Sequence, residues 1–241
     1  MKQFSFSATI AMALSMALFI CSCNSGGEKT TTDTTVDTTK KMSEPAPPAK
    51  PGNVLVIMHK VANYAKWLPE YESHDSTRQA HGLTNYVIGR GIEDSNMLHV
   101  VLKMSDVSKA KELIASPEMK ERMMKAGVEG KPAFEFIELV MLDPSTPAQT
   151  ARLRVTHKVK DWDAWKKEFD GSKQARMDAG LVDRAIGHSV DDNHMVSVVF
   201  MITDMAKAKA FMNSQDLKDR MSKAGVEGPP TFFFYNVAKK Y

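Results

Sequence analysis

Apolar and polar residues alternate in two stretches of this chain, residues 53–61 and 151–159. One side of each stretch is apolar apart from a single histidine: Leu55, Ile57, His59 and Val61 in the first, and Leu153, Val155, His157 and Val159 in the second. A period of two residues is typical of a β-strand. The pattern therefore predicts two strands that are related to each other.

This relation extends far beyond the strands, because the sequence repeats itself with an offset of 98 residues. KAGVEGKP at 125–132 returns as KAGVEGPP at 223–230, and HKV at 59–61 returns as HKV at 157–159. The same ungapped offset pairs Trp67 with Trp165. A recurrence of this length indicates a duplication. We predict two copies of one unit, residues 53–142 and 151–241, joined by the short linker DPSTPAQT at 143–150.

Each copy is predicted to contain strands and helices in the same order. The first strand leads into an amphipathic helix that begins after Asn63 or Asp161, and two strands separated by a polar turn follow. In the first copy these strands are LTNYVIGRG at 83–91 and MLHVVLKM at 97–104. Helical segments come next, and PAFEFIELVM or PTFFFYNVA closes the copy as a strand that is apolar on both sides. The order β-α-β-β-α-β is that of a ferredoxin-like unit, an α+β fold.

The N-terminal residues 1–23 have the pattern of a secretory signal. A continuous apolar run at 8–20 is followed by ICSC at 20–23, which resembles a bacterial lipobox with Cys23 as the lipidated residue. A plain signal or a membrane anchor is the alternative, and Cys21 is the other possible acceptor. Residues 24–52 are rich in Thr, Pro, Lys and Asp, which predicts a disordered tether. We expect lipid anchoring in the cell envelope, at the outer membrane and facing the periplasm.

Composition argues against several classes of function. The formal charge is +3, with both signs mixed along the chain, so we expect no nucleic-acid partner. Cys21 and Cys23 are the only cysteines, so the mature chain has no disulfide and no thiol chemistry. His74 and His81 share one helical face, but no third metal ligand accompanies them. We predict neither a metal nor a cofactor.

Three motifs shared by both copies carry a resemblance to a known family. They are HKV-x-x-[YW]-x-x-W-x-x-E-[YF], R-x-x-x-G-L and S-x-x-[ML]-K-x-R-M-x-KAGVEG-x-P. Each copy resembles the antibiotic-biosynthesis-monooxygenase-like domains of the dimeric α/β-barrel superfamily. The resemblance implies that the two copies pair sheet against sheet around a small-molecule site, as an intrachain pseudo-dimer in a monomeric protein. The superfamily includes cofactor-free oxygenases, isomerases, haem enzymes and proteins without known activity, so the motifs carry over no catalytic residue.

The two copies differ on the face of the first strand opposite to the histidine, and on the two strands that follow. The pairs that differ are Val54 and Arg152, Val56 and Arg154, Met58 and Thr156, Tyr86 and Arg184, Arg90 and His188, and His99 and Ser197. If this face lines the barrel, the cavity is apolar on one side and cationic on the other. The alternative is that Arg152 and Arg154 lie at an exposed edge.

The candidates for ligand binding are therefore Arg154, Arg184, Tyr86, Arg90, His59 and His157. The last two occur in both copies among Leu, Ile and Val, so core histidines are the alternative to a proton shuttle or a haem ligand.

Three functional hypotheses follow from these residues. The first is a lipoprotein that binds a small, partly apolar molecule between the two barrel halves. The second is a cofactor-independent monooxygenase or isomerase acting on an aromatic or polyketide-like substrate, with His188 or His99 as the base near Arg154 or Arg184. The third is a non-catalytic structural or interaction module, in which side chains fill the space between the sheets.

Overall fold

The computed structural model describes residues 51–241, and the predicted signal, the lipidated Cys23 and nearly all of the predicted tether lie outside them. The first copy comprises β1 (Gly52–Val61), α1 (Tyr64–Ser73), α2 (Asp75–Ala80), β2 (Leu83–Gly91), β3 (Met97–Met104), α3 (Val107–Ala115), α4 (Pro117–Lys125) and β4 (Val128–Leu142). The second comprises β5 (Ala151–Val159), α5 (Trp162–Gly171), α6 (Lys173–Asp178), β6 (Leu181–Ser189), β7 (Met195–Ile202), α7 (Met205–Met212), α8 (Gln215–Lys223) and β8 (Val226–Lys240).

Local sequence explains where the helices begin and break. The side chains of Asn63 and Asp161 accept hydrogen bonds from backbone N–H groups of the first turns of α1 and α5, as predicted. The long helix predicted in each copy is interrupted, at His74 in the first and at Ser172 in the second. Gly127 ends the α4 turn with a φ of +79°, a left-handed conformation that favours glycine. The repeat KAGVEG therefore marks the end of a helix.

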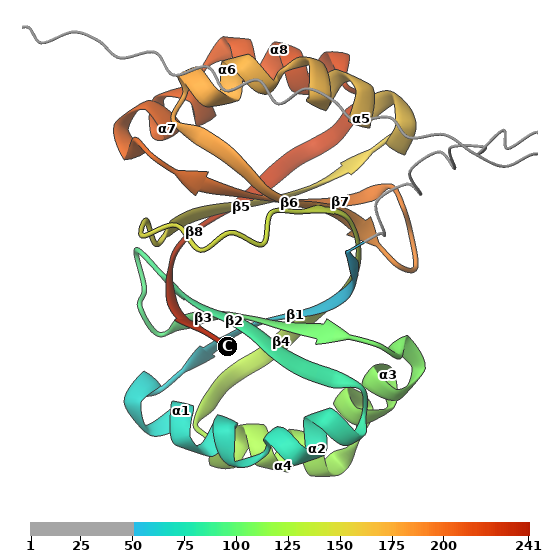
Figure 1. Cartoon of the computed structure of the whole chain (residues 1–241), viewed down its shortest axis with the longest axis vertical. Coiled ribbons are helices and arrows are strands. Elements are labelled where there is room, and N and C mark those ends of the chain that lie inside the picture. Colours follow the sequence, from blue (N-terminus) through green and yellow to red (C-terminus); the bar gives the residue numbers. More distant parts are fainter. Residues whose placement is uncertain (1–50) are drawn as a thin grey trace, which may run out of the picture. The chain divides into compact units, whose positions relative to one another are not determined.

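The eight strands form one closed barrel in the order β1-β3-β2-β8-β5-β7-β6-β4. The closing strand of each copy pairs with its own first strand and also with the other copy: β4 with β6, and β8 with β2. The helices of each copy cover the outer face of their own strands, and the strands of the two copies face each other (Figure 1). The predicted α+β fold with an intrachain pseudo-dimeric barrel is thus confirmed.

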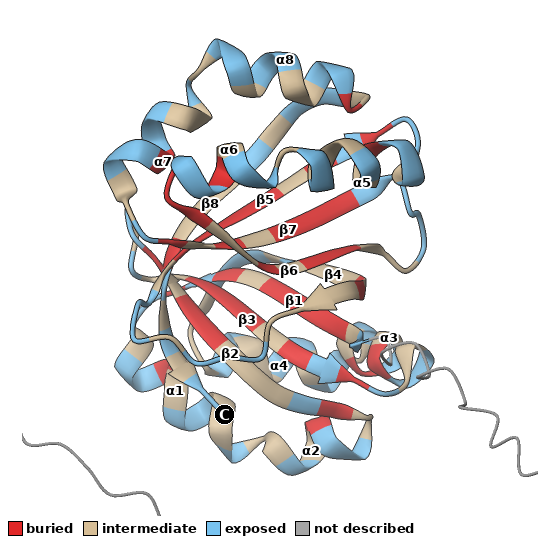
Figure 2. Ribbon diagram, turned by 45° about the horizontal axis from the view of Figure 1, so that its top comes forward, coloured by how far each residue is buried: buried red, intermediate tan, exposed pale blue. Residues whose placement is uncertain are grey.

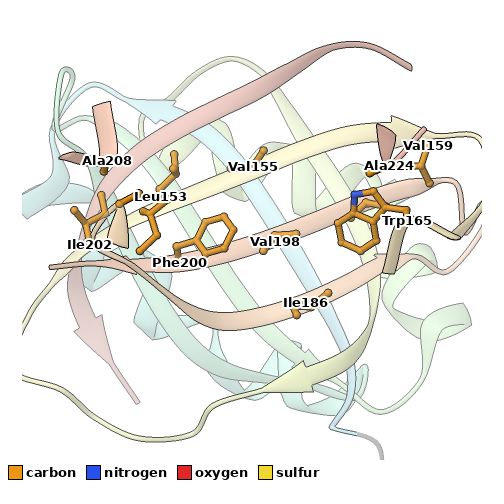
Figure 3. Packing of buried hydrophobic residues seen from close by; sticks show 13 residues of the cluster. Leu153, Val155, Val159, Trp165, Ile186, Val198, Phe200, Ile202, Ala208 and Ala224 are labelled. Carbon is orange, nitrogen blue, oxygen red and sulfur yellow. The ribbon is translucent and has the colours of Figure 1, made fainter. Parts of the chain in front are cut away.

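Three clusters of buried apolar side chains hold this arrangement together. Two related clusters lie between the strands and helices of each copy, around Trp67 and Trp165. Figure 3 shows the second of them, with Leu153, Val155, Val198 and Phe200 reaching from adjacent strands. A third, smaller cluster lies inside the barrel, on β1 and β4. Figure 2 shows that buried residues concentrate on the strands, while the outer helices are largely exposed.

The glycine in the repeated dipeptide IG allows the two copies to approach closely. A Cβ added to Gly187 would meet the backbone carbonyl oxygen of Glu138 on β4 and lie 2.8 Å from Cγ2 of Ile137. A Cβ added to Gly89 would lie 2.7 Å from Cε2 of Tyr235 on β8. Only glycine fits where each closing strand crosses to the other copy.

We therefore expect Gly187→Ala to lower the free energy of unfolding by roughly 2–4 kcal/mol, because the methyl group must displace backbone and break β4–β6 hydrogen bonds. Gly171→Ala is the matched control, since a Cβ there meets no heavy atom within 4 Å and alanine favours the helix. Urea denaturation of both variants measures the difference. Equal stability of the two variants would contradict the close approach.

Candidate functional site

The barrel encloses a cavity of about 300 Å³ between the two copies. One wall is apolar and comes from the first copy: Val54 and Val56 on β1, Val101 on β3, and Ile137 and Leu139 on β4. Small β-branched side chains predominate on this wall, which leaves the volume open. A cavity of this size is at the lower end of the range for small-molecule sites.

The opposite wall comes mainly from the second copy and is cationic. Arg152 and Arg154 on β5, Arg184 on β6 and Ser197 on β7 all line the cavity. Only 7% of Arg152 and 5% of Arg154 is exposed. Of the two predicted alternatives, the structure therefore places these arginines inside the barrel and not at an exposed edge.

Arg154 forms an ion pair that crosses from one copy to the other. Its Nη1 and Nη2 donate to the two carboxylate oxygens of Glu135 on β4, at 3.1 and 2.6 Å, and its Nε donates to Ser197 Oγ at 3.2 Å. Two parallel N–H···O bonds are the strongest arrangement for this pair of groups. All three nitrogens of Arg154 thus have partners.

Arg184 is bound by the linker between the copies. Its Nη1 donates to Asp143 Oδ2 and to Ser145 Oγ, and its Nη2 donates to the backbone oxygens of both residues. The N–H and hydroxyl of Ser145 and the Arg184 charge hold the pKa of Asp143 below its usual value. Further linker residues line the cavity: Thr146, Pro147, Gln149 and Thr150. The linker is therefore a wall of the site as well as a connection.

Arg152 differs from the other two arginines in having no carboxylate partner among the described residues. Its Nη1 donates to two backbone oxygens, those of Gln149 at 2.8 Å and Ala151 at 2.9 Å. Burial lowers the pKa of Arg152. A buried cation without a counter-ion is costly, so this side chain has unused capacity for an anion.

His99 and Tyr235 add two neutral polar groups to the cavity wall. His99 is 2% exposed, and neither of its ring nitrogens has a hydrogen-bond partner among the described residues. Burial, with a smaller contribution from Arg154, holds its pKa well below the usual value. Its ring centroid lies 4.7 Å from that of Tyr235, whose own pKa burial raises to about 12. At neutral pH both side chains are therefore uncharged.

Two β-bulges change the prediction for the second strand of each copy. The register of β2 shifts between Asn85 and Val87, and that of β6 shifts between Asp183 and Ala185. The extra residues are Tyr86 and Arg184, and both line the cavity.

Beyond each bulge the alternation is reversed, which corrects the placement of Arg90 and His188. The guanidinium of Arg90 lies 4.3 Å from the ring centroid of Tyr64 at the start of α1. The ring of His188 lies edge-on to Trp162 at the start of α5, with centroids 4.6 Å apart. Neither residue lines the cavity.

His59 and His157 also lie outside the barrel cavity. Each packs beside the tryptophan of its own copy, with ring centroids 5.5 Å apart, in small cavities of about 60 and 80 Å³ between strands and helices. Within residues 51–241 their ring nitrogens have no hydrogen-bond partner, and burial lowers both pKa values to about 4. The structure thus places them as core histidines, because they share a strand face with Leu55 and Leu153 rather than with Arg154.

The sequence-based prediction of site residues does not include Glu135, Asp143 or Tyr235. Glu135 and Tyr235 lie in the closing strands, which read as apolar on both sides, and Asp143 lies in a linker without a periodic pattern. One signal was available: the 98-residue offset pairs Glu135 with Phe233, a charge difference of the same kind as that between Val56 and Arg154.

In residues 51–241 no group of three or more His, Cys, Asp or Glu side chains is placed to hold a metal ion. His74 and His81 make local contacts instead, with Ser73 and with the backbone oxygen of Thr77. No helix in this part of the chain has the length and apolar character needed to cross a membrane.

Neither a family model nor a curated protein matches the chain, but solved structures do. An anthrone oxidase-like protein has a TM-score of 0.54 at 13% identity, over 78% of this chain and 92% of its own. A candidate monooxygenase from Fusobacterium nucleatum has a TM-score of 0.52 at 10% identity, with the same two coverages. A candidate monooxygenase from Lactobacillus acidophilus has a TM-score of 0.51 at 11% identity, over 78% and 94%.

At such low identity the likeness concerns the fold alone. The closed eight-stranded barrel and the two sets of outer helices agree with it. The chain has the fold of the dimeric α/β-barrel superfamily, with both halves of the barrel in one polypeptide.

Proposed function

We propose that this protein binds a small, partly apolar molecule in the cavity between the two barrel halves. The observation that carries the proposal is a cavity of about 300 Å³ whose wall contains His99, a buried imidazole for whose nitrogens the described part of the chain supplies no hydrogen-bond partner. Buried polar groups are nearly always hydrogen-bonded, and those that are not need an explanation. A bound molecule that completes the hydrogen bonding of His99 supplies one.

The two walls support different parts of such a molecule. Val54, Val56 and Ile137 offer apolar surface, and each Å² of apolar area removed from water contributes roughly 25 cal/mol. His99, as a neutral imidazole, can donate one hydrogen bond and accept another. The Tyr235 hydroxyl, whose pKa burial raises further above neutrality, is protonated at pH 7 and can donate a hydrogen bond. The cavity thus combines apolar affinity with a few orienting groups, as ligand sites do.

The test is saturable binding of a neutral apolar probe, octan-1-ol, to the full chain by titration calorimetry. We expect binding at one site, and Val56→Phe should abolish it by filling the apolar wall. Arg90→Met is the control, because Arg90 lies on the outer face of the barrel beside Tyr64. This variant should bind octan-1-ol as the unmodified chain does. Binding that survives Val56→Phe, or no saturable binding at all, would overturn the proposal.

We also propose that residues 1–23 direct the protein to the outer membrane, where Cys23 is lipidated and the barrel faces the periplasm. The lipobox-like sequence ICSC supports this. Cys23→Ala should move the protein from the membrane fraction to the soluble fraction, while Cys21→Ala should leave it in the membrane. The reverse pattern would assign the anchor to Cys21.

The second candidate function is that of a cofactor-independent monooxygenase or isomerase acting on an aromatic or polyketide-like substrate. His99 favours it, because this neutral imidazole, without a hydrogen-bond partner in residues 51–241, shares the cavity with Arg152, whose charge has no carboxylate bonded to it and can stabilise a developing enolate. The low pKa of His99 makes it a weak base, so only acidic carbon protons are within its reach. Dioxygen uptake with anthrone that is lost in His99→Phe would support turnover, and uptake unchanged in this variant would exclude His99 as the base.

The third hypothesis, a non-catalytic structural module, predicts that side chains fill the space between the two sheets. The cavity of about 300 Å³ between the sheets does not fit this prediction.

A further inference from the structure

We infer that the molecule bound in the barrel is a monovalent anion with an apolar body, an apolar monocarboxylate, and that Arg152 holds its carboxylate. The inference rests on the proposed function and specifies its ligand class. It follows from the charge balance of the cavity wall and from which donors of Arg152 are still unused.

The charges that line the cavity are balanced except at one residue. Glu135 neutralises Arg154, and Asp143 neutralises Arg184. The ammonium group of Lys240 is exposed at the rim, where its Nζ donates to the backbone oxygen of Pro144 at 3.3 Å. Arg152 is therefore the one buried cation of the described cavity wall with no carboxylate bonded to it, because the nearby Asp143 is already paired with Arg184. A single negative charge on the ligand completes the balance.

The geometry of the unused donors favours a carboxylate. The backbone bonds of Arg152 both use Nη1, and its Nε and Nη2 make no hydrogen bond within residues 51–241. These two nitrogens form one edge of the planar guanidinium, whose parallel N–H groups match the two oxygens of a carboxylate. The ligand can thus form a two-point ion pair without displacing the Gln149 and Ala151 carbonyls.

The position of Arg152 also sets the direction of the ligand. Its backbone partners are Gln149 in the linker and Ala151 at the start of β5, so the carboxylate lies on the side of the cavity that the linker lines. Arg152 is opposite Tyr235 in the β5–β8 register, which brings a second donor to the same place. The apolar body then extends along Val56 and Ile137. In the first copy the position equivalent to Arg152 is Val54, so the site has only one anion-binding end.

The test compares octanoate, octan-1-ol and octylammonium, which share their alkyl chain and differ in the head group. Titration of the full chain at about pH 7 should give octanoate an affinity at least tenfold higher than that of octan-1-ol, because bonds to charged groups are the stronger ones. Octylammonium should bind most weakly. In Arg152→Met the preference for octanoate over octan-1-ol should disappear, while octan-1-ol still binds.

Two further variants separate charge, geometry and folding. Arg152→Lys keeps the charge but not the paired donors, so it should retain only part of the preference, and Arg90→Met should retain all of it. Arg152→Met removes a costly buried charge, so its thermal midpoint should equal or exceed that of the unmodified chain.

Equal affinities for octanoate and octan-1-ol would overturn this inference and leave the proposed function standing. A charge preference that persists in Arg152→Met would assign the anion to another residue. If neither compound binds, both proposals fail.

Discussion

Residues 151–241 produced alone are expected to associate or aggregate, whereas the full chain is expected to be a monomer. The isolated second copy loses the partners of two strands, β4 for β6 and β2 for β8. It also exposes the inner face of its strands, including Tyr235, which is buried in the barrel, and Phe233, which is half-buried there. An uncovered apolar face next to unpaired strand edges favours association. In the full chain the linker keeps the other copy at an effective concentration of roughly millimolar, so intrachain pairing should prevail.

The ion pair between Arg154 and Glu135 should also decide which copies pair. The residue equivalent to Glu135 in the second copy is Phe233, so a homodimer of second copies would bury Arg154 opposite Phe233. In a homodimer of first copies, Glu135 would face Val56 instead of an arginine. Leaving the buried Arg154 without its partner costs about 3–5 kcal/mol, and leaving Glu135 unpaired costs less because its side chain is 36% exposed. Mixing residues 53–142 with residues 151–241 should therefore give a one-to-one complex at the expense of either homodimer.

Sedimentation of the two separate copies, of their mixture and of the full chain measures this preference. Arg154→Val is the informative variant, because valine occupies the equivalent position of the first copy and allows the second copy to pair with itself. We expect this variant to shift the mixture from the one-to-one complex towards homodimers. A folded, soluble monomer of residues 151–241 would show that no shared barrel is required for folding.

The duplication made the fold predictable, because each element of one copy was supported by its equivalent in the other. The side chains that face the cavity were harder to predict where the alternation is broken. Strict alternation places Arg90 with Tyr86 and His188 with Arg184, but one extra residue in each strand reverses the faces. No local pattern marks these bulges, since they become visible only when β2 and β6 are paired with their neighbours.

The other site features that the sequence did not predict depend on contacts between segments far apart in the chain. The linker lines the cavity because the barrel closes, and the sequence of eight polar and small residues carries no sign of this role. Similarly, Glu135 becomes a partner of Arg154 only because the two sheets face each other. By contrast, the buried position of Arg152 and Arg154 was among the predicted alternatives. Differences between equivalent positions indicate where the two copies supply different side chains to the cavity.

The second large effect concerns pH: we expect the free energy of unfolding to fall steeply as the pH drops from about 7 to about 5. Burial lowers the pKa values of His59 and His157 from 6.5 to about 4, so the unfolded chain binds protons in this range that the folded chain does not. Their contribution to stability is present above pH 6.5 and is lost as the pH falls towards 4. At about 1.4 kcal/mol per pH unit, each histidine accounts for about 2 kcal/mol by pH 5.

The double variant His59→Phe and His157→Phe should remove about 4 kcal/mol of this pH dependence. His99, whose pKa burial also lowers, accounts for a further part that the double variant retains. Phenylalanine keeps a ring beside Trp67 or Trp165, and cavities of about 60 and 80 Å³ adjoin the two sites, so the larger ring can be accommodated. Urea denaturation at several pH values between 7 and 5 measures the change, in a range where most carboxylates remain ionised.

His194→Gln is the matched control, because His194 is exposed and its contact with Asp192 lies at the surface, where ion pairs contribute little. The unmodified chain and this control should lose about 4 kcal/mol more than the double variant. If all three lose stability in parallel, the acid sensitivity arises elsewhere and the two buried histidines are not its cause.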